Sequence, residues 1–179
     1  MLSDVLFRLK KDLRRACNRY TSSWEGVLPY RCLQMGKVVK QGPWGGDAGK
    51  PFDTGVVDRV TNVKIYFDDV VHGLEITFNV GGTNKTMLIG EKKGASIEIT
   101  LGQDEHFTSI SGYFNSGTDI FIKQLTLTTD KDNNISAGKK TGNSFSLTLE
   151  GGQIVGFFGL GQPNIAVKAV GVYCSLVDS

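Results

Sequence analysis

Two histidines, His72 and His106, are the side chains of this sequence best suited to acid–base chemistry near neutral pH. A histidine-based catalytic site also needs a nucleophile in a context such as G-x-S-x-G, and neither histidine has one nearby. His106 directly follows Asp104 and Glu105, a cluster that is more typical of a solvated turn than of an acid–base site. The sequence predicts no catalytic residues, and we expect that the protein is not an enzyme.

The segment Asp130-x-Asp132-x-Asn134 begins like a calcium-binding loop. However, Ile135 occupies the sixth position, where such a loop needs glycine, and Thr141 occupies the twelfth, where it needs a bidentate glutamate. The three cysteines form no C-x-x-C pair, so they indicate neither a zinc site nor a disulfide framework, and a bridge between the first two is left open. They are Cys17, Cys32 and Cys174. We expect no metal and no cofactor.

Length and composition fit one globular domain, because the chain has 179 residues of which 40 % are apolar and 23 are glycine. The net charge of +2 is unevenly divided: residues 1–36 hold seven Lys or Arg and three Asp or Glu, which leaves 13 basic and 15 acidic side chains in residues 37–179. A slightly acidic body is not expected to bind nucleic acid. Charges interrupt the first 16 residues, so we expect no signal peptide and a cytoplasmic protein, with an extracellular origin left open if the sequence is a fragment.

Apolar residues recur every three or four positions near the N-terminus, which predicts a short amphipathic helix over residues 2–17. One interpretation is that its apolar stripe packs against the protein or a partner; the other is that the helix lies on an anionic membrane surface. Residues 18–36 show no period and are interpreted as a linker. Residues 1–36 would then be a basic leader, and residues 37–179 the main domain. The basic face consists of Arg8, Lys11, Arg15 and Arg19.

From about Lys37 onward, apolar and polar residues alternate as they do in strands that bury one face. Glycine pairs and Asp or Asn clusters separate these stretches, as expected of turns. The pattern contains no alternation of strands with helices and therefore predicts an all-β domain. The clearest alternating stretches are 63–67, 74–80, 97–101, 125–127 and 145–149.

A set of short motifs lies within the same part of the chain. They are Gly42-Pro-Trp-Gly-Gly-Asp-Ala-Gly49, Ile65-Tyr-Phe-Asp-Asp-Val70, His72-Gly-Leu-Glu-Ile-Thr-Phe78, Ile110-Ser-Gly-Tyr-Phe114, Leu125-Thr-Leu-Thr-Thr-Asp130, Ile154-Val-Gly-Phe-Phe-Gly159 and Ala169-Val-Gly-Val-Tyr173. In this order and spacing the set resembles the jacalin-related lectins over about residues 37–176. The resemblance implies a β-prism of three four-stranded Greek-key sheets that binds sugar with short loops at one end. It is closest to the mannose-type branch, because many residues precede the first-loop glycine where galactose-type relatives have a cleaved amino terminus.

The resemblance also implies a set of sugar-binding positions, namely Gly49, Asn164, Ile165, Ala166 and Lys168. In the family the first loop offers a glycine N–H, which corresponds here to Gly49. The last loop carries a G-x-x-x-D motif, but this chain has Asn164 at the glycine position and Lys168 at the aspartate position. The last loop also looks about two residues longer, with residues 160–163 inserted before it.

Lysine only donates hydrogen bonds, so Lys168 cannot accept the two hydroxyl bonds that the family aspartate accepts. One interpretation is a solvated loop lysine on a site that has lost or weakened ordinary monosaccharide binding. The other is a changed specificity, such as an acidic glycan paired with Lys168.

The leading functional hypothesis is a carbohydrate-binding module of the jacalin type, with an altered or weakened sugar site and glycans as partners. The alternative is a β-prism scaffold for protein or membrane contact without sugar binding, used as the targeting domain of a larger protein. A homodimer is compatible with both hypotheses.

Overall fold

The computed structural model describes residues 37–176, which form twelve strands and no helix. This part of the chain therefore offers no helix that could cross a membrane. The strands are β1 (Val38–Gly45), β2 (Lys50–Asp53), β3 (Arg59–Phe67), β4 (Val71–Val80), β5 (Thr83–Gly90), β6 (Ala95–Thr100), β7 (Phe107–Phe114), β8 (Ile122–Thr129), β9 (Asn134–Gly138), β10 (Asn143–Thr148), β11 (Gly152–Gln162) and β12 (Ala166–Leu176). The helix expected over residues 2–17, with Cys17 and Cys32, lies outside the described residues, and the division at residue 36 stays a prediction.

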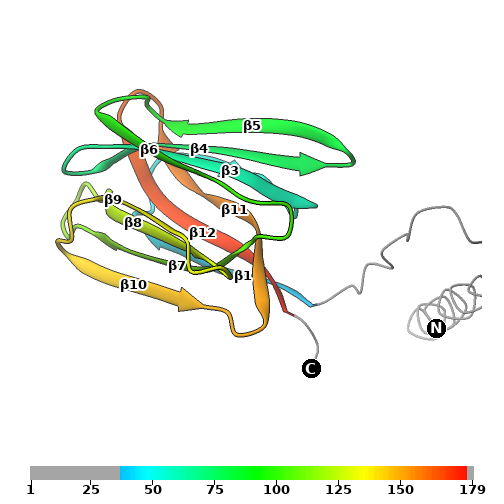
Figure 1. Ribbon diagram of the computed structural model, residues 1–179. Coiled ribbons are helices and arrows are strands. Elements are labelled where there is room, and N and C mark those ends of the chain that lie inside the picture. The colour runs from blue at the N-terminus through cyan, green and yellow to red at the C-terminus, as the bar shows by residue number, and fades with distance from the viewer. Residues whose placement is uncertain (1–36, 177–179) are drawn as a thin grey trace, which may run out of the picture. The chain divides into compact units, whose positions relative to one another are not determined.

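The strands form three four-stranded antiparallel sheets, with the orders β1-β12-β11-β2, β10-β7-β8-β9 and β5-β4-β3-β6. Figure 1 shows the sheet of β5, β4, β3 and β6 above that of β10, β7, β8 and β9, with β11 and β12 running between them. In each sheet the non-consecutive neighbours are the crossovers of a Greek key. The predicted all-β prism of three Greek-key sheets is confirmed.

The first sheet contains the first two and the last two strands of the domain, and this arrangement brings the β1–β2 loop next to the β11–β12 turn. Strand β12 lies between β1 and β11, and β2 pairs with the other side of β11. The connection from β1 to β2 must therefore pass over the turn that joins β11 to β12. As a result, residues 46–49 lie against the hairpin end that begins at Gly161 and leads into β12.

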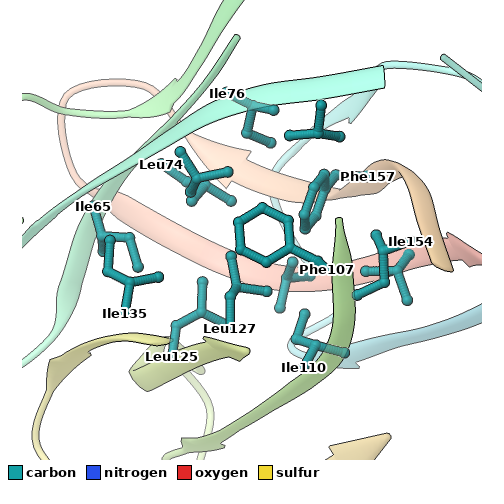
Figure 2. Packing of buried hydrophobic residues seen from close by; sticks show 14 of the residues in the cluster. Ile65, Leu74, Ile76, Phe107, Ile110, Leu125, Leu127, Ile135, Ile154 and Phe157 are labelled. Carbon is teal, nitrogen blue, oxygen red and sulfur yellow. The ribbon is translucent and has the colours of Figure 1, made fainter. Parts of the chain in front are cut away.

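All three sheets contribute apolar side chains to one core. Figure 2 shows Leu74 and Ile76 from one sheet, Leu125 and Leu127 from another, and side chains of β11 surrounding the ring of Phe107. The alternating stretches of the sequence supply these residues, since each strand turns every second side chain inward. Each fully buried side chain of this size contributes roughly 1.5–3 kcal/mol to folding. The core thus fixes the ends of the strands, from which the loops project.

Strand β12 differs from the other strands because it is buried on both faces, with every residue from Ala166 to Cys174 buried. Its sequence is accordingly apolar almost throughout, as a strand covered on both sides requires. The exception is Lys168, which is 3 % exposed. Among residues 37–176, Lys168 and Glu105 are the only buried Lys, Arg, Asp or Glu side chains. A buried charge needs a partner, and the partner of Lys168 defines the candidate site.

Candidate carbohydrate site

Lys168 extends from β12 toward the loop that connects β7 to β8. Its ammonium group donates to the Oδ1 atom of Asp119 and lies 3.6 Å from the centre of the Phe121 ring. The Asp119 side chain is 69 % exposed, whereas that of Lys168 is 3 % exposed. The ion pair therefore joins a buried cation to an anion at the surface. The expectation of a solvated loop lysine was wrong, because Lys168 belongs to a strand that is covered on both sides.

The β7–β8 loop is braced by the side chain of Asn115. The Asn115 amide group donates to the backbone carbonyl of Asp119 over 2.8 Å, and its Oδ1 atom accepts the Phe121 N–H over 2.6 Å. These two bonds hold the backbone on both sides of the Asp119–Phe121 segment. Because Asp119 is set by its own loop and by Lys168, its carboxylate has a defined place at this end of the domain.

The β1–β2 loop reaches the same place through its glycines. The Gly46 N–H donates to the Lys168 carbonyl over 2.9 Å. Gly45 has a φ of +125°, and a Cβ atom there would lie 2.3 Å from the same carbonyl oxygen. A Cβ atom on Gly46 would lie 3.1 Å from the Ile120 side chain. Only residues without side chains let the first loop approach both β12 and the β7–β8 loop this closely.

A three-residue turn, Pro163 to Ile165, joins β11 to β12. The Ile165 N–H donates to the Gln162 carbonyl over 3.1 Å, and Asn164 has a φ of +59°. Asparagine adopts this left-handed conformation more readily than most residues, which explains how it stands at the position of the family glycine. Residues 160–162, expected as part of a longer loop, are instead paired in β11.

His72, at the start of β4, links this turn to the β3–β4 loop. Its Nδ1 atom lies 3.1 Å from the Ile165 carbonyl oxygen, and its Nε2 atom lies 2.7 Å from Oδ2 of Asp68. Both neighbours are acceptors, so both contacts are hydrogen bonds only when the ring carries two protons. The bond to His72 lowers the pKa of Asp68, against a smaller opposing effect of desolvation. His72 thus connects the β11–β12 turn to the β3–β4 loop.

The structure brings together the residues that the sequence predicts to bind sugar, but their exposure differs. Gly49 lies in the exposed β1–β2 loop, and a Cβ atom there would be 3.1 Å from the Gly161 carbonyl oxygen. Asn164 is exposed, and Ile165 is 42 % exposed. Ala166 is 1 % exposed, so its side chain faces inward. Their roles in binding stay predictions.

The sequence interpretation missed the β7–β8 loop and with it Asp119 and Phe121. Asp119 is 49 positions from Lys168, and nothing in either local sequence indicates the other. One signal was present, since Lys168 interrupts the apolar run that forms β12. A lone charge in a strand of this type requires a buried partner of opposite sign, although the sequence does not say where that partner is.

A groove with a volume of about 480 Å³ lies between the edge strands β2 and β5. It meets the hairpin end at Gly161 and Pro163 but does not include Lys168 or Asp119. The candidate site is therefore a junction of loops at the surface, separate from this groove. Besides those two hairpin residues, Lys50, Pro51, Phe52, Asp53, Met87, Leu88, Ile89 and Gly90 line the groove.

Chemically, the junction offers hydrogen-bonding groups and a charge pair but no nucleophile with a base. The Asp119 carboxylate retains acceptor capacity because Lys168 binds only one of its oxygens. Among residues 37–176, no group of three or more His, Cys, Asp or Glu is placed to hold a metal ion. Such a junction can bind a polar ligand through directional hydrogen bonds.

A β-prism with a junction of short loops at one end defines a class of binding domain, and comparisons with known proteins identify the family. The Jacalin-like lectin domain matches residues 41–173. The chain belongs to this family, the jacalin-related lectins. It is 31 % identical to horcolin of Hordeum vulgare over 157 residues, which cover 78 % of this chain and 98 % of horcolin.

Solved structures of lectins share the fold. Wild-type Malaysian banana lectin superposes with a TM-score of 0.70 at 31 % identity, covering 79 % of this chain and 100 % of the lectin. The artocarpin–mannotriose complex superposes with a TM-score of 0.70 at 25 % identity, covering 78 % of this chain and 99 % of artocarpin. These relatives are lectins and not enzymes, which favours a binding role for this chain over a catalytic one.

Proposed function

We propose that this domain binds a carbohydrate, without catalysing a reaction, at the junction of the β1–β2, β7–β8 and β11–β12 loops. The observation that carries the proposal is that the β1–β2 loop and the β7–β8 loop both contact the buried Lys168, which closely follows the β11–β12 turn in β12. Membership of the lectin family supports it, as does the likeness to artocarpin, which is solved with mannotriose. A sugar hydroxyl both donates and accepts, so it suits a junction that presents backbone groups and a carboxylate together.

Mannose-type sugars are the first ligands to test, because artocarpin is solved in complex with mannotriose and with a methyl mannoside. The site differs from the family pattern at the aspartate position, where a lysine now pairs with a carboxylate of another loop. We propose that this change alters the strength or the selectivity of binding. The alternative of a scaffold without sugar binding, a homodimer and the location in the cell stay predictions.

The test is a glycan array screened with the full chain, followed by isothermal titration with methyl-α-mannoside and mannotriose. We expect binding of at least one neutral mannose-containing glycan. Gly46→Leu should abolish it, because the side chain would meet Ile120, which lies 3.1 Å from the position of a Cβ atom. Gly81→Leu is the matched control, since nothing lies within 4 Å of a Cβ atom there. Absence of any glycan signal from the folded wild-type chain would contradict the proposal.

A further inference from the structure

We propose that Asp119 is the sugar-binding carboxylate of this chain, and that Lys168 is the residue that positions it. This inference rests on the proposed function. The acceptor that the family pattern places in the last loop would thus come from the β7–β8 loop. The ligand would be a neutral sugar that donates two hydroxyl groups, and not an acidic glycan.

Lys168 is not available to a ligand. It is 3 % exposed, its ammonium group is bound to Asp119, and the Phe121 ring lies 3.6 Å from the nitrogen. An acidic glycan could pair with this cation only by displacing Asp119 from it. That displacement would also break the contact between a braced loop and β12. The lysine is therefore better suited to hold the loop than to recognise a negative charge.

Asp119, in contrast to Lys168, is accessible to a ligand. Its side chain is 69 % exposed, and the pairing with Lys168 uses Oδ1. An ionised carboxylate has about four acceptor positions on two oxygens, so most of its capacity is open to hydroxyl donors. Hydrogen bonds from neutral donors to an ionised acceptor are stronger than those between neutral groups. A small sugar makes few contacts, so strong hydrogen bonds of this kind favour its binding.

The surroundings keep this carboxylate in one place. Asn115 holds the backbone at Asp119 and at Phe121. Ile120, between them, lies where a side chain on Gly46 would be, so the loop packs directly on the glycines of the first loop. A surface aspartate usually samples several rotamers, whereas this one is fixed by a buried cation below it. Preorganisation of this type favours binding because less freedom is lost when the ligand arrives.

The net charge of the junction also favours a neutral ligand. The positive charge of Lys168 is balanced by Asp119 and is out of reach of solvent. What faces the solvent is the negative partner. A glycan carboxylate would approach this anion directly, and the desolvation of two like charges opposes such a contact.

The test compares Asp119→Asn with Glu98→Gln in the full chain. Asparagine retains an oxygen that can accept from Lys168 but removes the charge that strengthens hydroxyl bonds. Glu98 pairs with Lys64 at 3.2 Å and its side chain is 55 % exposed, so Glu98→Gln removes a similar exposed charge on β6, away from the loops. Titration with mannotriose should show a loss of affinity of roughly 10- to 100-fold for Asp119→Asn. Glu98→Gln should change the affinity by less than about twofold, and thermal melts establish that both variants fold.

Lys168→Met tests the positioning role. Methionine keeps the volume, and the carboxylate that it leaves unpaired is exposed, so the variant should fold. Its affinity for mannotriose should fall by less than that of Asp119→Asn. The double variant Asp119→Asn with Lys168→Met should bind no better than Asp119→Asn alone. If Asp119→Asn does not fold, this double variant replaces it, since it has no buried cation to leave unpaired.

Three results would overturn the inference. If the wild-type chain binds mannotriose and Asp119→Asn binds equally well, Asp119 is not the acceptor, while the proposed function stands. If a sialylated trisaccharide binds, and Lys168→Met abolishes this binding while Asp119→Asn strengthens it, Lys168 recognises an acidic glycan instead. If the folded wild-type chain binds neither sugar nor any glycan of the array, the proposed function fails, and the inference fails with it.

Discussion

Glu105 and Asp119 are two carboxylates beside opposite ends of β8, and the protein uses them differently. Glu105 is 6 % exposed and accepts bonds from the Gly102 N–H at 3.0 Å and from Thr129 and Asn133 at 2.7 Å each. These donors lower its pKa to about 2, with Asn133 the largest cause and Gly102 the next. Within residues 37–176, Asp119 has one partner at its side chain, Lys168, and it is largely exposed.

The difference separates a structural carboxylate from one that can serve a ligand. Glu105 ties the β6–β7 loop to the β8–β9 turn, and the protein itself fills its acceptor positions. At the loop junction the protein fills part of the capacity of Asp119 and leaves the rest toward solvent. Exposure alone does not distinguish a ligand-binding carboxylate, because many exposed carboxylates are mobile. What distinguishes Asp119 is that a buried cation, Lys168, holds it in place. If the two ends are independent, a substitution at one end should leave the role of the other end unchanged.

Lys168→Asp should have the largest effect. It restores the residue type of the family motif but places a second carboxylate in a buried strand, beside Asp119 and without a cation. We expect a loss of about 3–5 kcal/mol in the free energy of unfolding, measured by urea denaturation. Combining it with Asp119→Lys should recover part of this loss, since the opposite charges are then exchanged. A Lys168→Asp single variant as stable as the wild type would show that this buried position tolerates a carboxylate without a cation.

Gly45→Ala should follow, because the new Cβ atom would lie 2.3 Å from the Lys168 carbonyl oxygen at a φ of +125°. The backbone of the first loop must then move away from β12. We expect about 2–4 kcal/mol of destabilisation together with loss of mannotriose binding. Gly81→Ala, in the β4–β5 turn at the other end, has φ +59° and open space around it, so it should cost about 1 kcal/mol and leave binding unchanged. Equal effects of the two variants would remove the distinction between the ends.

The fold was predictable because two local signals agree. Alternation of apolar and polar residues sets the strands, and motifs such as Gly42 to Gly49 fix which prism they form. The predicted site residues on the first and last loops do lie together, because β1 and β11 flank β12 in the same sheet.

The role of the third loop was not predictable from the sequence. Asp119 comes from a different sheet and meets Lys168 only when the prism closes. In the sequence Lys168 therefore looked like a lysine in a loop with no acceptor, and no sequence signal singled out Asp119. Burial of Lys168 is a tertiary property, since it depends on the cover that β7–β8 and the first loop supply. Local patterns record which face of a strand is apolar, but not which distant loop covers its end.

Glu105→Gln should act on acid stability and not on sugar binding. The folded pKa of Glu105, about 2, is below its ordinary value of 4.5. Its ionised form therefore stabilises the fold above about pH 4.5, and this contribution is lost as the pH falls from about 4.5 to about 2. The difference in unfolding free energy between the wild type and the variant should be largest at neutral pH and shrink over that interval, as measured by urea denaturation at a series of pH values. A constant difference, or a change in mannotriose affinity, would show that the cluster does not act as an isolated structural element.

His72→Phe should have the smallest effect on the fold and a measurable one on the site. The ring volume is kept, but the contacts of Nδ1 with Ile165 and of Nε2 with Asp68 are lost. The β11–β12 turn then loses its link to the β3–β4 loop, while its own bond from Ile165 to Gln162 remains. We expect roughly a threefold to tenfold loss of mannotriose affinity, the size of one net hydrogen bond, with little change in melting temperature. Because His72 contacts the last loop and Asp119 belongs to another, the losses of His72→Phe and Asp119→Asn should add in the double variant. Losses that fail to add would mean that the last loop and the β7–β8 loop are energetically coupled at the site.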